Sequence, residues 1–429
     1  MESRLECVEH QSGEIIVSLV HRLQIQKTLA GLGLGLFIAV QGLVFLEKGF
    51  TTWHIGIAYG VFAISAALLE LPLGALADIR GRIHVFRWSL WAEALAWLVA
   101  IFASQFWQII FAMFLLGFGR ALNTGTIDAW QIEQINKQGL NHKLAQLLAR
   151  FQSTSSIAIG IGAVCGGYLP EFIGNQYGLQ PTEWNMVACV LFVTSQMILL
   201  PWLFQEGDQV EHKNKSGQVH HQIKKTLIFG WQSQIIRPLF WVSFVIGIIV
   251  ICIEAFWQVQ IKTISPDVSY RIFGWLALGY FLSGAIGPIS IGWLMTRINL
   301  SESSWISLIC ALIVPTLYLL SIQNTVVGFT VYYLLFMALF SMTHIPLDTL
   351  LHNHLPDRIR SSMGSVISLV LLAGAAISSI GLSLLIEVVG ISTVWQYLAT
   401  FMLFFVVFRL LSVVSNRNKN ESTVLKITN

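Results

Sequence analysis

Charged residues are scarce in this 429-residue sequence. Asp, Glu, Lys and Arg together make up 11% of it, whereas about 25% is usual for soluble domains. Hydrophobic residues make up 55%, and 27 Phe and 15 Trp are among them. This composition excludes an ordinary soluble domain and predicts that lipid surrounds most of the chain.

Three further absences narrow the class of protein. The five cysteines are scattered and form no C-x-x-C pair, which excludes a disulfide framework or a cysteine metal site and is typical of buried apolar filler. No G-x-x-x-x-G-K-[ST] loop is present, which excludes an ATP-hydrolysing pump within this chain. No alternation of apolar and polar residues is sustained along the chain, which excludes a membrane β-barrel.

Apolar windows near twenty residues long recur from end to end. A helix of about 20 residues, rising 1.5 Å per residue, crosses the roughly 30 Å of hydrocarbon in a bilayer. The sequence therefore predicts an all-α membrane protein with twelve transmembrane helices, over residues 29–47, 54–77, 86–104, 107–129, 151–173, 184–204, 238–260, 272–296, 304–322, 326–349, 362–387 and 391–413.

Basic residues are distributed unevenly among the segments that join these windows. With both termini inside, 21 of the 25 Lys and Arg residues lie in cytoplasmic segments or, for Arg87 and Arg409, at the cytoplasmic ends of windows. Three lie outside, and Arg120 lies within a window. Cytoplasmic loops of membrane proteins carry such an excess of Lys and Arg. We therefore expect a multi-pass protein of the cell (inner) membrane with both termini cytoplasmic.

The longest polar interruption divides the windows six and six. The predicted order is a cytoplasmic tail, a six-helix bundle, a cytoplasmic linker, a second six-helix bundle and a second cytoplasmic tail, over residues 1–28, 29–204, 205–237, 238–413 and 414–429. A weak internal repeat agrees, since GTIDAW with Asp128 and IPLDTL with Asp348 lie 220 residues apart. Internal repeats of this kind are typical of secondary transporters.

Between the second and third windows, residues 70–82 read ELPLGALADIRGR. This turn resembles the G-x-L-a-D-r-x-G-R motif of the major facilitator superfamily, although Ile79 and Ile83 replace basic residues that are usual there. The resemblance implies the major facilitator fold and a conformational latch made of Gly74, Asp78, Arg80, Gly81 and Arg82. Gly74 would let the eleventh helix approach closely, and Asp78 would face the free N–H groups of a helix N-terminus.

The fifth window ends in a glycine cluster, SSIAIGIGAVCGGYLP. Its end resembles the G-P-x-x-G-G part of a motif found in drug and proton antiporters, with Ala163 in place of the proline. The resemblance implies antiporter-like roles for Gly162, Gly166 and Gly167. Glycine clusters also serve ordinary close packing of membrane helices, and this alternative stays open.

Ionisable side chains inside the windows are candidates for function, because a charge at mid-bilayer costs about 2.5 to 3.5 kcal/mol on insertion scales. Three windows carry polar residues at helical spacing, namely Arg120, Asn123, Thr124 and Asp128 in the fourth, Glu254, Trp257 and Gln258 in the seventh, and Ser341, His344 and Asp348 in the tenth. By the resemblance, these helices and the first line a central pathway, so we expect the three faces to meet Gln41. Glu93 in the third window is either a packing partner or a proton relay.

The resemblance implies a transporter rather than an enzyme. We expect proton-coupled export of a small amphipathic organic molecule by alternating access, performed by a monomer in membrane lipid without cofactor, bound metal, catalytic residue or nucleic-acid partner. The alternative is proton-coupled uptake of a nutrient or metabolite on the same scaffold. A remote alternative is a membrane-embedded acyltransferase, suggested by the H-x-x-x-x-D spacing of His352 and Asp357.

Overall fold

The computed structural model describes residues 2–124, 126–139, 143–204, 227–228, 230–233, 236–355 and 357–407. These residues are mostly helical and contain no β-sheet, only an isolated bridge between Gln176 and Leu179. Within the same ranges, ten helices are long and apolar enough to cross a membrane. The predicted all-α membrane fold is therefore confirmed.

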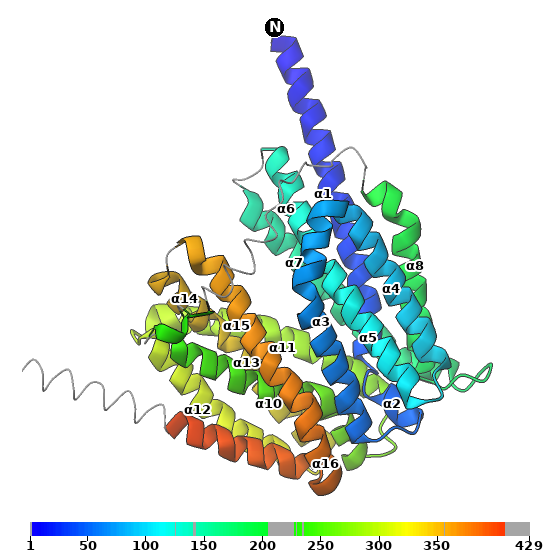
Figure 1. Ribbon diagram of the computed structural model, residues 1–429, viewed down its shortest axis with the longest axis vertical. Coiled ribbons are helices and arrows are strands. Elements are labelled where there is room, and N and C mark those ends of the chain that lie inside the picture. The colour runs from blue at the N-terminus through cyan, green and yellow to red at the C-terminus, as the bar shows by residue number, and fades with distance from the viewer. Residues whose placement is uncertain are drawn as a thin grey trace, which may run out of the picture. The chain divides into compact units, whose positions relative to one another are not determined.

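The chain divides into two compact units, and the first consists of Met1–Val219 and Val268–Leu278. Besides the beginning of α11 (Tyr270–Arg297), its helices are α1 (Glu2–Ile38), α2 (Leu43–Glu47), α3 (Thr52–Arg80), α4 (Arg82–Phe102), α5 (Phe106–Asn123), α6 (Ile127–Lys137), α7 (Leu144–Ile173) and α8 (Glu183–Leu203) (Figure 1). Helix α1 begins at Glu2, so helical backbone runs through the segment predicted as an N-terminal tail.

The second unit consists of His220–Asp267 and Gly279–Asn429. Besides the rest of α11, its helices are α10 (Arg237–Ile264), α12 (Glu302–Ser321), α13 (Val326–Met342), α14 (His344–His354), α15 (Asp357–Ile377), the π-helix η3 (Ser378–Leu382), α16 (Ser383–Val389) and the apolar helix Ile391–Val407.

Three of the predicted spans are interrupted helices. The first consists of α1 and α2, the fourth of α5 and α6, and the tenth of α13 and α14. Thr126 directs both its N–H and its hydroxyl to the Asn123 carbonyl, at 3.1 and 2.7 Å. Thr343 does the same to the Phe340 carbonyl, at 3.0 and 2.7 Å. Such local bonding competes with the regular helix, and it ends α5 and α13 at corresponding places of the internal repeat.

The first unit is held together by unusually close helix packing. Helix α1 packs along α7 and α8. A Cβ atom on Gly35 would overlap the backbone of Ile159 and Gly162, so the backbones of α1 and α7 are in direct contact. Large apolar side chains fill the remaining core, including Leu23, Phe86, Trp97, Trp130 and Phe204. Small residues that bring backbones together are a common basis of helix association in membranes.

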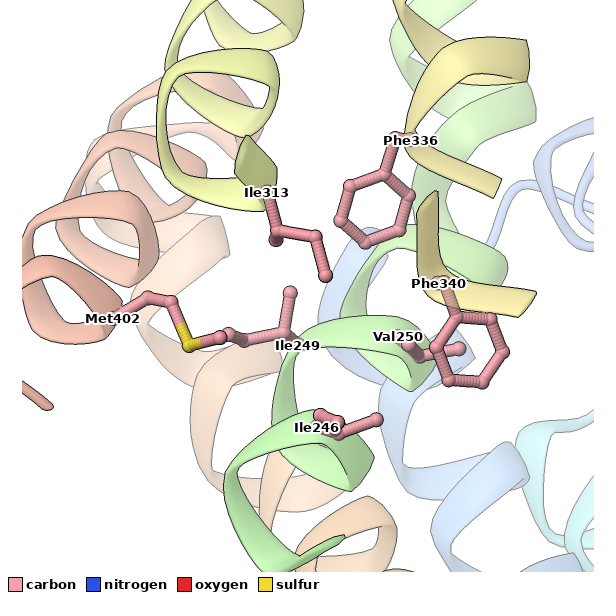
Figure 2. A pocket seen from close by; sticks show the side chains of 7 residues that line it. All are labelled: Ile246, Ile249, Val250, Ile313, Phe336, Phe340 and Met402. Carbon is pink, nitrogen blue, oxygen red and sulfur yellow. The ribbon is translucent and has the colours of Figure 1, made fainter. Parts of the chain in front are cut away.

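The second unit uses the same kind of contact between α10 and α15, where Gly247 meets the Leu371 carbonyl and Gly374 meets the Phe244 carbonyl. A small pocket lies between α10, α12, α13 and the helix Ile391–Val407 (Figure 2). Its lining is apolar throughout and consists of Ile246, Ile249, Val250, Ile313, Phe336, Phe340 and Met402. These side chains offer a polar substrate no hydrogen bond.

Candidate functional site

Gln41 lies where the first span is interrupted, and it is half-buried. The Val40 N–H donates to the Phe37 carbonyl, and the Leu43 N–H donates to the Val40 carbonyl, both at 2.9 Å. The backbone between α1 and α2 therefore makes tight turns closed by hydrogen bonds between residues three positions apart. Irregular backbone at membrane depth is tolerated where it is buried in protein or lines a cavity, and in transporters it often marks a binding region.

The fourth span is interrupted between α5 and α6, so its predicted polar residues do not lie along one continuous helix, and their role in the pathway stays a prediction. Arg120 and Asn123 are exposed near the end of α5, and the helix breaks before Asp128. The Arg120 guanidinium lies 5.6 Å from the ring centroid of Phe62 on α3, in a cation–π arrangement. The interruption at Thr126 ends the helical period that aligns these residues in the sequence.

Asp128 lies in the first turn of α6 and forms an ion pair with Lys27 on α1 at 2.7 Å. The side chain of Asp128 is 71% exposed. Sequence spacing could not identify Lys27 as its partner, because the two residues are 101 positions apart. The predicted pathway role of Asp128 stays a prediction, and the pair links α1 to α6.

Glu254 on α10 is half-buried and accepts a hydrogen bond from the Tyr280 hydroxyl on α11 at 2.6 Å. Its predicted neighbours Trp257 and Gln258 are 2% and 1% exposed. Trp257 stacks on Tyr333 of α13, with ring centroids 5.2 Å apart. Sequence analysis missed both tyrosines, since they come from other helices and carry no charge.

The tenth span is interrupted as well, between α13 and α14, and the predicted pathway role of its polar residues stays a prediction. His344 and Asp348 are exposed on α14, whereas Ser341 is buried at the end of α13. The Ser341 hydroxyl donates to the Ser283 carbonyl of α11 at 3.1 Å, so this side chain serves packing between helices. The ring of His344 lies 5.3 Å from that of Phe340, edge to face.

The motif between the second and third spans forms a sharp turn. Gly81 has φ of +90°, a value that favours glycine, and it ends α3 and precedes α4. Arg82 binds Glu133 of α6 at 3.2 Å, and Arg80 is exposed. No described atom lies within 4 Å of a Cβ placed on Gly74. The expected approach of the eleventh helix to Gly74 stays a prediction.

The side chain of Asp78 lies outside the described part of the chain, so its predicted role in the latch stays a prediction.

The glycine cluster of α7 faces two helices of the first unit. Added Cβ atoms on Gly162 and Gly166 would overlap the carbonyls of Leu32 and Leu36 on α1. Gly167 faces Gly274 of α11, whose Cα would lie 2.9 Å from such an atom. The cluster therefore serves close packing, whether or not it also has an antiporter role.

Polar contacts that the sequence did not reveal tie α11 to α2 and α7. The Tyr270 hydroxyl donates to Glu47 at 2.6 Å. Arg271 binds Glu171 at 2.5 Å, and the Ser269 hydroxyl donates to the same carboxylate. These residues lie at the ends of spans, where charged and polar side chains are ordinary, so the sequence alone does not single them out.

Two further carboxylates are buried to different degrees. Glu183 at the start of α8 forms an ion pair with Lys48, and each side chain is 7% exposed. Glu93, in the middle of α4, is half-buried and receives a hydrogen bond from the indole of Trp97 at 3.4 Å. The choice between packing and proton relay for Glu93 stays open.

Within the described ranges, no cluster of three or more His, Cys, Asp or Glu side chains could hold a metal ion. The side chains of His352 and Asp357, which suggested an acyltransferase, lie outside the described part of the chain.

Comparison with known proteins agrees with the helical architecture. Residues 25–260, more than half of the chain, match the family model described as Major Facilitator Superfamily. The chain therefore belongs to this superfamily of secondary transporters and is a multi-pass membrane protein.

Among its relatives is the uncharacterized MFS-type transporter YxaM of Bacillus subtilis, which is 22% identical over 391 residues, 88% of this chain and 92% of that protein. The inner membrane transport protein YajR of Escherichia coli is 25% identical over 173 residues, 40% of this chain and 35% of that protein.

Two solved structures share the fold. The nucleoside transporter NupG superposes with a TM-score of 0.75 at 13% identity, over 92% of this chain and 98% of that one. A bacterial homologue of the iron transporter ferroportin, in an inward-facing state, superposes with a TM-score of 0.72 at 16% identity, over 91% and 97% of the two chains. At these identities the similarity shows the fold alone.

Proposed function

We propose that the protein exports a small amphipathic organic molecule across the inner membrane in exchange for protons. Membership of the superfamily supports a small-molecule substrate and alternating access. The excess of Lys and Arg in the predicted cytoplasmic segments supports an orientation with both termini inside. The resemblance of Gly162, Gly166 and Gly167 to an antiporter motif supports export.

The hydrogen bond between Glu254 and Tyr280 carries the proposal of proton coupling. A phenol can donate a hydrogen bond to a carboxylate and can accept one from a carboxylic acid. Glu254 can therefore bind or release a proton while its partner at 2.6 Å stays bonded. If protonation of a buried carboxyl group removed its hydrogen-bond partner, the unpaired group would cost free energy and protonation would be opposed. The pair suits a carboxyl group that changes protonation once in each transport cycle.

Trp257 lies three residues after Glu254 on α10. It is 2% exposed and stacked on Tyr333, which in turn stacks on Phe329 with centroids 5.9 Å apart. A ring enclosed in this way cannot also cover a substrate in the same conformation. We assign Trp257 to holding α10 and α13 together beside Glu254, and we assign the change of charge to the carboxyl group.

Everted membrane vesicles test the proposal directly. Respiration acidifies their interior, which a pH-sensitive acridine dye reports as quenching. We expect that a transported compound, found by screening a panel of amphipathic cations and neutral molecules, releases protons and restores fluorescence only in vesicles that contain this protein. Absence of any compound-dependent proton release, across a panel that includes compounds to which the deletion strain is sensitive, would contradict proton-coupled export.

The substitution Glu254→Gln tests whether the Glu254 carboxyl group carries the coupling proton. It keeps the shape of the side chain and removes its titration, so compound-driven proton release should fall at least about 100-fold, as for loss of a group on which coupling depends. Tyr280→Phe should give a smaller loss, about tenfold, because one hydrogen bond to a charged group is removed. Asp267→Asn, an exposed carboxylate change in the loop after α10, should have no effect.

The direction of compound transport distinguishes the alternative function, uptake by symport, from export. In right-side-out vesicles with an acidic exterior, a symporter would accumulate the compound, whereas an exporter would expel it.

A further inference from the structure

Two backbone carbonyls in the first unit lack their regular helical donors, for different reasons. The Gly166 carbonyl of α7 would be paired with residue 170, which is proline and has no N–H. The Leu36 carbonyl of α1 would be paired with Val40, whose N–H donates instead to Phe37 at 2.9 Å. Both carbonyls face α8.

The side-chain amide of Asn185 donates to both of them. Its nitrogen lies 2.8 Å from the Leu36 carbonyl oxygen and 2.8 Å from the Gly166 carbonyl oxygen. Asn185 is completely buried, with 0% of its surface exposed. Because both partners are acceptors, the orientation of the amide group follows from the chemistry. One side chain therefore replaces the donors that Pro170 and the interrupted helix do not supply.

Residues next to Asn185, at the start of α8, bind the segment that follows the interruption, namely the end of α2. The N–H and hydroxyl of Thr182 donate to Glu47 at 3.1 and 2.5 Å. Glu183 forms the buried ion pair with Lys48. Asn185 thus anchors the chain before residues 39–42, and its neighbours anchor it after them. Gln41 lies between the two anchors.

We propose that Asn185 is a positioning residue that holds the interruption of the first span, and with it Gln41, in the geometry that transport requires. The importance of this geometry for transport rests on the proposed function, together with the prediction from the family resemblance that Gln41 lines the pathway. The anchoring itself rests only on the two hydrogen bonds and the surrounding contacts of α8.

Hydrogen–deuterium exchange of the purified full chain in detergent tests the anchoring. Asn185→Leu keeps the approximate volume and removes both donors. We expect the amides of residues 37–44 to exchange about tenfold faster, since loss of a buried hydrogen bond raises the population of locally open states by this order. Gln196→Leu removes another buried amide of the same helix and should leave residues 37–44 unchanged.

A second substitution separates the two hydrogen bonds. Pro170→Ala supplies a helical N–H to Gly166, so Pro170→Ala/Asn185→Leu should unfold at a higher temperature than Asn185→Leu yet keep the faster exchange of residues 37–44. If Asn185→Leu alone does not fold, this double variant provides the same measurement with only the Leu36 carbonyl unpaired. Unchanged exchange at residues 37–44 in the folded variant would overturn the proposal.

Labelling reports on Gln41 itself. In a background with the five native cysteines replaced by serine, Gln41→Cys should react with N-ethylmaleimide several-fold faster once Asn185→Leu is added, and an equal rate would again count against positioning. Neither measurement needs a substrate or a proton gradient. Their failure would therefore reject the role of Asn185 alone, whereas failure of the vesicle assay with the unaltered protein would reject the proposed function.

Discussion

At the scale of single residues, burial decides how much an ion pair contributes to the stability of the folded protein. Lys27 and Asp128 are 2.7 Å apart, but 71% of the Asp128 side chain is exposed, so water and salt screen the pair. Lys48 and Glu183 are each 7% exposed, and Lys48 also donates to two backbone carbonyls at 3.0 and 3.1 Å. If either Lys48 or Glu183 were removed, the remaining charge would be buried without water to replace its partner.

Lys48→Met should therefore destabilise the protein strongly, by about 3 to 5 kcal/mol, because methionine fills the space and leaves Glu183 buried without its cation. Asp128→Asn should cost less than about 1 kcal/mol. Thermal unfolding of both variants in the same detergent measures the difference. Adding Glu183→Gln to Lys48→Met should recover part of the loss, and equal unfolding temperatures for the two single variants would show that the Lys48 pair contributes no more than a surface pair.

At the scale of helices, glycines that look alike in sequence have different surroundings. Gly162 of α7 meets the Leu32 carbonyl of α1, so a side chain there would push two backbones apart. Gly74 of α3, which belongs to the superfamily motif, has no described atom within 4 Å of an added Cβ. The contact between α1 and α7 therefore requires a glycine at residue 162, whereas no described contact of Gly74 within the first unit requires one.

Gly162→Ala and Gly74→Ala form a matched pair for this difference. Gly162→Ala should lower stability by about 1 to 3 kcal/mol through overpacking and reduce the yield of monodisperse protein in fluorescence-detected size-exclusion chromatography. Gly74→Ala should fold as the unaltered protein does. A Gly162→Ala protein with normal yield and unfolding temperature would contradict the close contact between α1 and α7. Normal folding of Gly74→Ala with impaired transport would place the need for glycine in another conformational state.

Local sequence predicted the positions of the helices but not the places where they are interrupted. Apolar windows predicted where helices lie, because length and hydropathy are local properties. They did not predict that Thr126 and Thr343 would turn back to the carbonyls three residues earlier. The internal repeat did not mark them, since Thr126 lies two residues before Asp128 and Thr343 lies five residues before Asp348. Threonine inside an apolar helix is also usually compatible with helical backbone.

At the scale of the whole molecule, charge distribution predicts orientation. The chain forms two compact units with α11 contributing to both. Of its 25 Lys and Arg residues, 21 lie in segments predicted to be cytoplasmic or at the cytoplasmic ends of predicted spans. Short loops rich in Lys and Arg resist translocation during insertion. Orientation is therefore a property of the loops rather than of the helix packing.

Reporter fusions test this orientation. Alkaline phosphatase should be active after residues 178, 265 and 390, and a fluorescent protein should fold after residues 140, 215 and 420, because the first reporter requires the external side and the second the cytoplasm. Each fusion point receives both reporters, so every position has its own control. A pair of positions at which both reporters behave in the opposite way would reject the predicted orientation.

The sequence by itself determined that this protein is a bundle of membrane-spanning helices. Its apolar windows must satisfy their backbone hydrogen bonds within the chain, and a helix does so using neighbouring residues alone. Only the tertiary structure decided which polar groups meet. Glu254 receives its hydrogen bond from Tyr280 on another helix, and Asn185 joins carbonyls of α1 and α7 that lie 149 and 19 positions away. Such partners depend on which helix faces meet, and that is settled by close packing across the whole unit rather than by spacing along one helix.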